Sequence, residues 1–250
     1  MNARRIAAAV LLAASTAVLT ACAGADGSDE STVTVLAAAS LTDAFTELAD
    51  AYEREHPGVS VEVSFGSSTT LAQQVTAGAD VDVLASAGEN ALARLPADLT
   101  ADDRVVTIAT TTLEIAVPQG NPAQVRGLEN LARADLDVVL CAETAPCGMA
   151  ADEVFSRADV VPHVVSRELD ARATLAKVAL GEADAAVVYR ADVASADDRV
   201  DGVAVPADDN VVLGYPMVRV SDAPHAFGFV DLVTGAVGRR LLADAGFEAP

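Results

Sequence analysis

Two apolar runs typical of buried strands, at 33–39 and 81–85, and one segment at 59–65 that alternates apolar and polar residues are each followed by helical spacing. After the run that begins at Val33, the next apolar side chains fall on one helical face at Phe45, Leu48 and Tyr52. Repeated strand, turn and helix predict an α/β fold built on a parallel sheet with crossover helices. The three pairs are strand 33–39 with a helix that ends before Pro57, strand 59–65 with a helix that stops at Gly78, and strand 81–85 with a helix that ends before Pro96.

The pattern continues in a second α/β unit, which two adjacent strands at 105–109 and 113–117 introduce. No Gly/Ser-rich linker divides the chain, so strands near 110–113 and 211–216 are expected to join the two units. The C-terminal helices are then expected to return to the first unit. The other predicted elements are strands 138–141, 185–188, 203–205 and 211–220, and helices from near Gly148, over 171–180 and in two pieces over 226–247.

The N-terminus has the pattern of an export signal. Arg4 and Arg5 precede an apolar run over 6–19, which is short for a membrane span, and small residues follow it. The ending Leu-Thr-Ala-Cys resembles the bacterial lipobox. We therefore predict a lipoprotein signal peptide over 1–21, lipidation of Cys22, a tether over 22–31 and a place on the extracytoplasmic face of the bacterial cell membrane. The alternative is a plain signal peptide with a coincidental cysteine.

The chain is strongly acidic, with 37 Asp and Glu against 16 Lys and Arg and a formal net charge of −21. Such a charge disfavours binding to nucleic acid or to an anionic membrane surface. No segment after the leader is apolar enough to span a membrane, so the lipid is the only membrane attachment expected.

Cys141 and Cys147 are the two cysteines that remain after Cys22. In an exported protein, a pair this close in sequence favours a disulfide that closes a small loop. The spacing excludes a C-x-x-C redox site, and no histidine stands nearby to complete a metal site.

Small or hydroxylated residues stand at four predicted strand-to-helix junctions, which share the sheet edge where ligands bind. With Asp43, Ser40 forms an S-x-x-D pattern, so its simplest role is to cap a helix. The free backbone N–H groups at the start of a helix also suit an anion. Arg54 is the only basic residue between Ser31 and Ala93, so an anion at these junctions would be held by neutral donors rather than by lysine or arginine. Neutral donors alone satisfy a fully deprotonated tetrahedral dianion, whereas a protonated oxyanion also needs an acceptor. The junctions are Ser40, Ser67–Ser68, Ser86–Ala87 and Cys147–Gly148.

An enzyme is not expected. A nucleophilic serine needs a neighbouring base, but His56 stands at a predicted helix end, and His163 and His225 adjoin prolines in predicted loops. The G-x-S-x-G, H-E-x-x-H and P-loop patterns are absent from the sequence. Tyr189, at the end of a predicted buried strand, is compatible with core packing as well as with a ligand.

Five segments resemble the molybdate-binding proteins of ABC importers in order and spacing, over essentially the whole chain from about Thr32. The resemblance implies the two-lobed periplasmic binding protein fold of type II, with a mainly parallel sheet flanked by helices in each lobe and the ligand in the cleft between them. The segments are AAASLTDAF (37–45), SFGSSTTLAQQV (64–75), ADVDVLASA (79–87), GEADAAVVY (181–189) and LLADAGF (241–247).

The resemblance also implies which groups hold the oxyanion, with no cofactor and no direct cation ligand. Cys147 stands where the family often has alanine, a change that a main-chain donor tolerates. Ala171 aligns only by its position before a helix. The implied hydroxyl donors are Ser40, Ser68 and Tyr189, and the implied backbone N–H donors are Ser68, Ala87, Cys147 and Ala171.

The implied protein is a monomeric, extracytoplasmic substrate-binding subunit. It would capture molybdate or tungstate and deliver it to a membrane permease driven by a cytoplasmic ATPase. The alternatives are a binding protein of the same fold for sulfate, phosphate or another small anion, and a serine-dependent extracytoplasmic enzyme. The implied domains are lobe 1 over 32–110 with 217–250, and lobe 2 over 111–216 with hinge strands at both ends.

Overall fold

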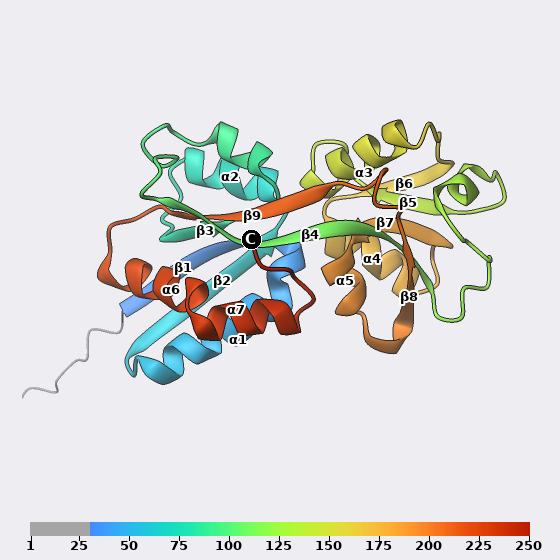
Figure 1. Ribbon diagram of the computed structural model, residues 1–250. Coiled ribbons are helices and arrows are strands. Elements are labelled where there is room, and N and C mark those ends of the chain that lie inside the picture. Colours follow the sequence, from blue (N-terminus) through green and yellow to red (C-terminus); the bar gives the residue numbers. More distant parts are fainter. Residues whose placement is uncertain (1–30) are drawn as a thin grey trace, which may run out of the picture.

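The computed structural model describes residues 31–250, so the predicted signal peptide, Cys22 and most of the predicted tether lie outside the described residues. Two groups of helices and strands stand side by side (Figure 1). They are joined by two long strands, β4 (Val105–Pro118) and β9 (Val212–Arg219). The α/β class predicted from the sequence is confirmed. Between residues 31 and 250, no helix has the length and apolar character needed to cross a membrane.

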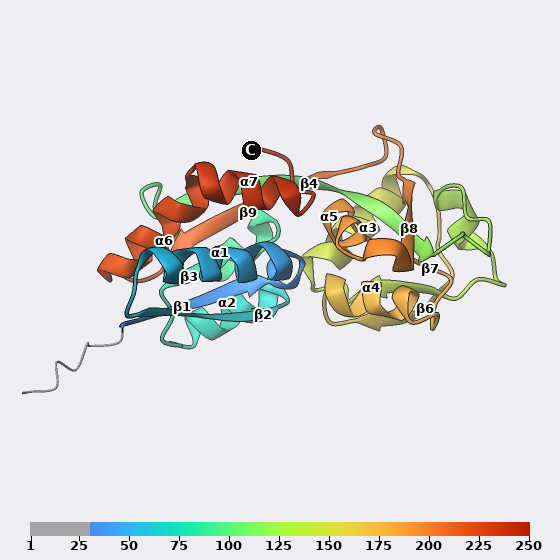
Figure 2. The ribbon, with the colours of Figure 1, turned by 90° about the horizontal axis from the view of Figure 1, so that it is seen from below.

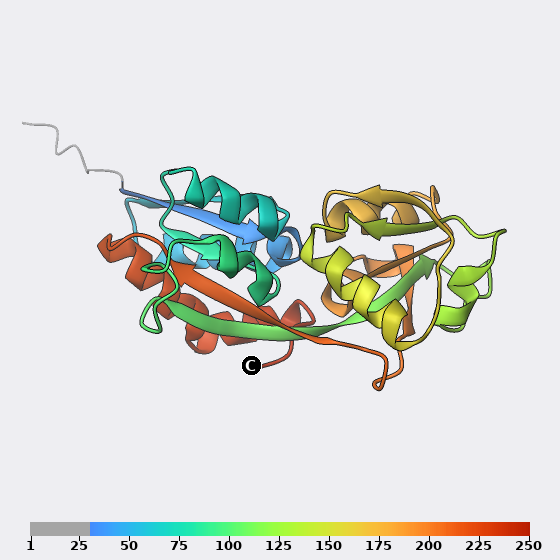
Figure 3. The same cartoon turned by 90° about the horizontal axis from the view of Figure 1, so that it is seen from above.

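The first lobe is a sheet with helices on both faces. Strand β1 is buried on both sides: Val35 faces the cluster that contains Phe45 and Phe229, and Leu36 faces the cluster that contains Leu71. This explains why the second half of β1, from Val35 to Ala38, is a continuous apolar run rather than an alternating one. Helices α1, α6 and α7 lie on one side (Figure 2), and α2 lies on the other (Figure 3). The elements are β1 (Ser31–Ala38), β2 (Val59–Gly66), β3 (Val83–Ala85), α1 (Thr42–Glu55), α2 (Ser68–Thr76), α6 (Pro224–Thr234) and α7 (Ala236–Asp244).

The second lobe repeats this construction around three parallel strands. Its core includes Leu175 of the helix Ala171–Ala179 and Val188 of the strand Ala185–Tyr189, with Ala116 of β4. The whole sheet has the order β2-β1-β3-β9-β4-β7-β5-β6, with β8 paired to β4. The elements are β5 (Val138–Cys141), β6 (Val164–Glu168), β7 (Ala185–Tyr189), β8 (Val200–Ala204), α3 (Pro146–Arg157), α4 (Ala171–Ala179) and α5 (Arg190–Ala194), with 3₁₀ turns at Leu128–Ala132 and Asp197–Arg199.

Strand β4 runs through both lobes without a break. Its residues 105–112 pair with β9, and its later residues pair with β7 and β8. The prediction of two separate strands at 105–109 and 113–117 is therefore wrong. The residues between them are Thr110, Thr111 and Thr112, whose β-branched side chains favour an extended backbone. The lobe boundaries implied by the resemblance stay a prediction.

One predicted helix differs in type from the structure, and another begins slightly earlier than predicted. The segment before Pro96 forms only a 3₁₀ turn, Glu89–Arg94. It follows Gly88, which has a φ of 72° and whose N–H donates to the carbonyl of Gly214 on β9 at 2.8 Å. Helix α3 begins at Pro146 rather than near Gly148 because proline is well suited to the first helical position. Strand β6 and the short helix α5 were not predicted from the sequence.

Candidate functional site

The carboxyl ends of strands from both lobes meet around one small cavity. The cavity has a volume of about 10 Å³, counted as the space that the centre of a water-sized sphere can reach. Pockets for organic ligands enclose about 300–1,000 Å³, so this cavity suits one compact ion. All six residues that the resemblance implied line the cavity: Ser40, Ser68 and Ala87 from the first lobe, and Cys147, Ala171 and Tyr189 from the second.

Three helices begin at the cavity. Ser68 is the first residue of α2, Cys147 is the second residue of α3, and Ala171 is the first residue of α4. The first N–H groups of a helix have no partner within it, and the helix dipole is positive at that end. The arrangement therefore provides backbone donors from both lobes and a favourable potential for an anion.

Ser40 does not cap a helix. It lies in a 3₁₀ turn, Ala39–Leu41, and Leu41 is the N-cap residue of α1 without a side-chain cap hydrogen bond. The capping interpretation of Ser40 and Asp43 is therefore wrong, because the extra turn moves Ser40 away from the start of α1. The Ser40 hydroxyl instead lies 2.9 Å from the hydroxyl of Tyr215 on β9.

Ser68 and Ala87 contact each other at the edge of the cavity. The N–H of Ala87 donates to Oγ of Ser68 at 2.9 Å. In this arrangement Ala87 orients the serine, and Ser68 keeps its own hydroxyl proton for another acceptor. Direct donation from Ala87 to a ligand stays a prediction. Ser86, at the same junction, does not line the cavity, since its hydroxyl donates to the carbonyl of Gly88 at 3.0 Å.

Tyr189 brings an unpartnered hydroxyl to the cavity. Within residues 31–250, three buried side-chain atoms have no hydrogen-bond partner: the Tyr189 hydroxyl, Oδ1 of Asp192 and Nε of Arg172. Burial, together with the nearby Asp192, raises the pKa of the Tyr189 hydroxyl well above its usual value, so the group stays protonated. A buried donor without an acceptor is costly, which makes an oxyanion an effective partner.

Asp192 lies directly behind Tyr189 and is fully buried. Its Oδ2 accepts the backbone N–H of Tyr189 at 3.2 Å, and its Oδ1 is 4.0 Å from Nε of Arg172. Burial raises the pKa of the Asp192 carboxyl to about 7, although the Arg172 guanidinium lowers it. The carboxylate therefore holds the end of β7 in place and does not line the cavity.

Sequence reasoning missed one acidic residue of the cavity wall, Asp170. It is the N-cap residue of α4, and its Oδ1 accepts the N–H of Ala173 at 2.9 Å. The signal was present in the sequence, since an aspartate directly before a predicted helix is a preferred cap. No lysine, arginine or histidine lines the cavity, and residues 31–250 contain no cluster of His, Cys, Asp or Glu that could hold a metal ion.

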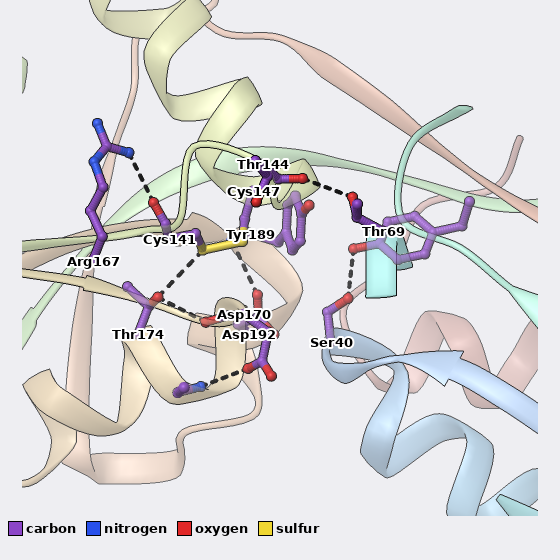
Figure 4. The surroundings of a disulfide bond; sticks show 12 residues. Ser40, Thr69, Cys141, Thr144, Cys147, Arg167, Asp170, Thr174, Tyr189 and Asp192 are labelled. Atoms are coloured by element: carbon purple, nitrogen blue, oxygen red, sulfur yellow. Dashed lines mark hydrogen bonds between the residues drawn. A yellow bond between two sulfur atoms is a disulfide. The ribbon is translucent and has the colours of Figure 1, made fainter. Parts of the chain in front are cut away.

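The predicted disulfide between Cys141 and Cys147 is confirmed, with a Cα–Cα distance of 5.8 Å. It closes the loop that leads from β5 into α3, just before the backbone donors of that helix. Thr144 of this loop accepts a hydrogen bond from the Thr69 hydroxyl of α2 at 2.7 Å (Figure 4). The bridged loop therefore also contacts the first lobe.

An ion pair joins the lobes beside the cavity, between Asp43 of α1 and Arg172 of α4. We expect Asp43→Asn to lower ligand affinity about 1.5-fold to fivefold, because a half-exposed pair contributes about 0.2–1 kcal/mol and this pair joins the two lobes beside the cavity. Isothermal titration at low salt measures the effect. Asp135→Asn is the matched control, since Asp135 pairs with Arg133 within the second lobe. Equal affinities of the wild type and Asp43→Asn would contradict the expectation.

Comparisons with known proteins agree with this architecture. The chain matches the family of bacterial extracellular solute-binding proteins over residues 33–248. It is 36% identical over 221 residues to the molybdate-binding protein ModA of Mycobacterium tuberculosis, covering 87% of this chain and 85% of the relative. It is 29% identical over 206 residues to YvgL of Bacillus subtilis, a putative ABC transporter substrate-binding lipoprotein, covering 80% and 78%.

Among solved structures, the periplasmic molybdate-binding protein of Azotobacter vinelandii has the same fold, with a TM-score of 0.75 at 21% identity. The match covers 87% of this chain and 99% of that one. The family match and the relatives agree over almost all of the described residues. The chain therefore belongs to the bacterial extracellular solute-binding proteins and, among them, is of the ModA type.

Proposed function

We propose that the protein binds molybdate or tungstate in the cavity between its lobes. The observation that carries the proposal is a cavity of neutral donors from both lobes, which includes the unpartnered hydroxyl of Tyr189. The relatives named as molybdate-binding proteins support the choice of ligand. The six residues proposed to hold the oxyanion are Ser40, Ser68, Ala87, Cys147, Ala171 and Tyr189.

The donor chemistry favours a fully deprotonated oxyanion. The Asp170 carboxylate, the one acid of the cavity wall, already accepts a backbone N–H within its own helix. A protonated oxyanion such as hydrogenphosphate needs an acceptor of its own, and Oδ2 of Asp170 is the one carboxylate oxygen of the wall without that backbone hydrogen bond, so titration with phosphate tests the preference directly. Sulfate is also a dianion, so the protein must distinguish it from molybdate by size. An ion that fits loosely in the cavity leaves some donors without an acceptor, which lowers its affinity.

Binding rather than catalysis also agrees with the partners of the two serines. The Ser40 hydroxyl lies against Tyr215, and Oγ of Ser68 accepts the N–H of Ala87. Neither contact supplies a general base. His56 and His225 lie near Tyr52, and Nδ1 of His163 lies 3.1 Å from the carbonyl of Leu136, so none of the histidines is a partner of these serines.

We further propose that the chain is an extracytoplasmic lipoprotein, anchored through Cys22, that acts as a monomer and delivers its ligand to an ABC permease with a cytoplasmic ATPase. The lipobox-like ending before Cys22 supports the anchor, as does the description of the Bacillus relative as a substrate-binding lipoprotein. Closure of the lobes completes the donor shell and gives the permease a distinct surface to recognise.

Isothermal titration of the purified protein with four oxyanions tests the proposal. We expect molybdate and tungstate to bind tightly, and sulfate and phosphate to bind at least about 100-fold more weakly, a difference of about 2.7 kcal/mol from unpaired donors. Preferential binding of sulfate or phosphate would support the alternative of another small-anion carrier. No binding of any oxyanion would refute the proposed function.

A further inference from the structure

Tyr215 lies next to the cavity but not in its wall. It belongs to β9, one of the two strands that join the lobes, and its side chain is fully buried. The ring packs edge-on against Tyr189, with centroids 5.9 Å apart, and against Phe247, with centroids 4.9 Å apart. Its hydroxyl lies 2.9 Å from the Ser40 hydroxyl. Packing therefore fixes the ring, and the hydroxyl contacts a residue of the proposed ligand set.

The direction of this hydrogen bond follows from counting acceptors. Within residues 31–250, the Ser40 hydroxyl is the one hydrogen-bond partner of the Tyr215 hydroxyl. If Ser40 donated to Tyr215, the phenol proton would have no acceptor, and Ser40 would turn a lone pair toward the anion. If Tyr215 donates to Ser40, the serine proton is free for the cavity, and both protons are satisfied once an anion is bound.

The protonation state of the phenol agrees with this direction. Burial, together with the nearby Tyr189 and Asp192, raises the pKa of the Tyr215 hydroxyl well above its usual value, while its hydrogen bond with Ser40 lowers it. The phenol therefore stays protonated at neutral pH, and a fixed donor behind Ser40 leaves that serine to act as a donor in turn.

We propose that Tyr215 is a positioning residue for oxyanion capture: its hydroxyl donates to Ser40 Oγ and so directs the Ser40 proton into the cavity. The assignment rests on the proposed function. Each hydrogen bond of the chain from Tyr215 through Ser40 to the anion polarises the next, which strengthens the donor that the anion meets. A strand that joins the lobes thereby takes part in binding without touching the ligand.

The test is a double-mutant cycle on molybdate affinity. Tyr215→Phe keeps the ring between Tyr189 and Phe247 and removes only the hydroxyl. We expect it to weaken binding about threefold to tenfold, the usual effect of one lost hydrogen bond. In the Ser40→Ala background the same substitution should have no further effect, because the residue through which it acts is gone. Titration measures tight binding, and the rise of the unfolding midpoint with ligand concentration extends the range to weak binding.

Tyr52→Phe is the matched control. Tyr52 is an equally buried tyrosine whose hydroxyl donates to the carbonyl of His225 at 3.2 Å, away from the cavity. Removal of the Tyr52 hydroxyl should leave molybdate affinity unchanged.

Two results would overturn the assignment of Tyr215. One is an unchanged affinity of Tyr215→Phe, and the other is an equal loss with and without Ser40, which would mean that Tyr215 has only a structural role. A wild type that binds sulfate or phosphate instead overturns the proposed ligand, and the same cycle run with that anion still decides the role of Tyr215. A wild type that binds no oxyanion overturns the proposed function, and the assignment with it.

Discussion

Removal of one hydroxyl in Tyr189→Phe is expected to weaken molybdate binding about tenfold to a hundredfold. The group is fully buried, lines the cavity and has no hydrogen-bond partner within the described residues. A hydrogen bond to a charged partner contributes about 1.5–3 kcal/mol, which corresponds to this loss of affinity. The ring remains to pack against Tyr215, so the shape of the cavity wall is kept. Isothermal titration with molybdate measures the change.

The same substitution should act in the opposite direction on the ligand-free protein. The wild type buries a hydroxyl without an acceptor, and its removal relieves a penalty of about 1 kcal/mol or more. The unfolding midpoint without ligand is therefore expected to stay the same or rise, while the increase caused by molybdate becomes smaller. An affinity equal to that of the wild type would remove Tyr189 from the ligand set, and a lower midpoint without ligand would indicate a defect in packing instead.

Loss of the disulfide, in the double variant Cys141→Ala with Cys147→Ala, is expected to lower the free energy of unfolding by about 2 kcal/mol. The bridge constrains the unfolded chain across a sequence separation of 6 residues, and its half-cystines are buried at the end of β5 and the start of α3. For a chain of this size, the loss corresponds to a fall of about 4–8 °C in the unfolding midpoint. Thermal unfolding followed by circular dichroism measures it.

A reductant provides the control for this variant. Dithiothreitol should lower the midpoint of the wild type and leave the double variant unchanged. We also expect weaker molybdate binding, because the bridged loop carries Thr144, which accepts the hydrogen bond from Thr69 of the other lobe. A wild type whose midpoint does not respond to reductant would contradict a stabilising role for the bridge.

The strands of the core were predictable because each is a local apolar run. Val138–Cys141 was predicted residue for residue, and Ala185–Tyr189 almost so. The element boundaries that were predicted wrongly depend on contacts between residues that are distant in the sequence. The loop that precedes the 3₁₀ turn at Glu89–Arg94 is hydrogen-bonded to β9, and β4 continues through its threonines because β9 pairs with them. The β-branched threonines favour an extended backbone locally, but no local pattern identifies β9 as their partner.

The candidate site was likewise predictable only where it depends on local sequence. The serines at strand-to-helix junctions could be identified in the sequence. Because the strands are parallel, their carboxyl ends bring these residues to the same edge of the sheet. The cap assigned to Ser40 failed because a 3₁₀ turn separates Ser40 from the start of α1, and the partner that its hydroxyl has instead, Tyr215, is 175 residues away. The ion pair of Asp43 with Arg172 joins residues 129 apart and depends on how the lobes meet.

By itself, the sequence determined the α/β class, the short loop that the disulfide closes, and the small, neutral donors at the strand ends. These features were predictable because hydrophobic periodicity and residue spacing can be read from short stretches of the sequence. Only the tertiary structure decided the partners of these donors: within residues 31–250, the N–H of Ala87 donates to Oγ of Ser68, the Tyr189 hydroxyl has no partner, and the Ser40 hydroxyl contacts Tyr215 on a strand that joins the lobes. Hydrogen bonds require partners within about 3 Å, and that distance is set by the packing of the whole chain.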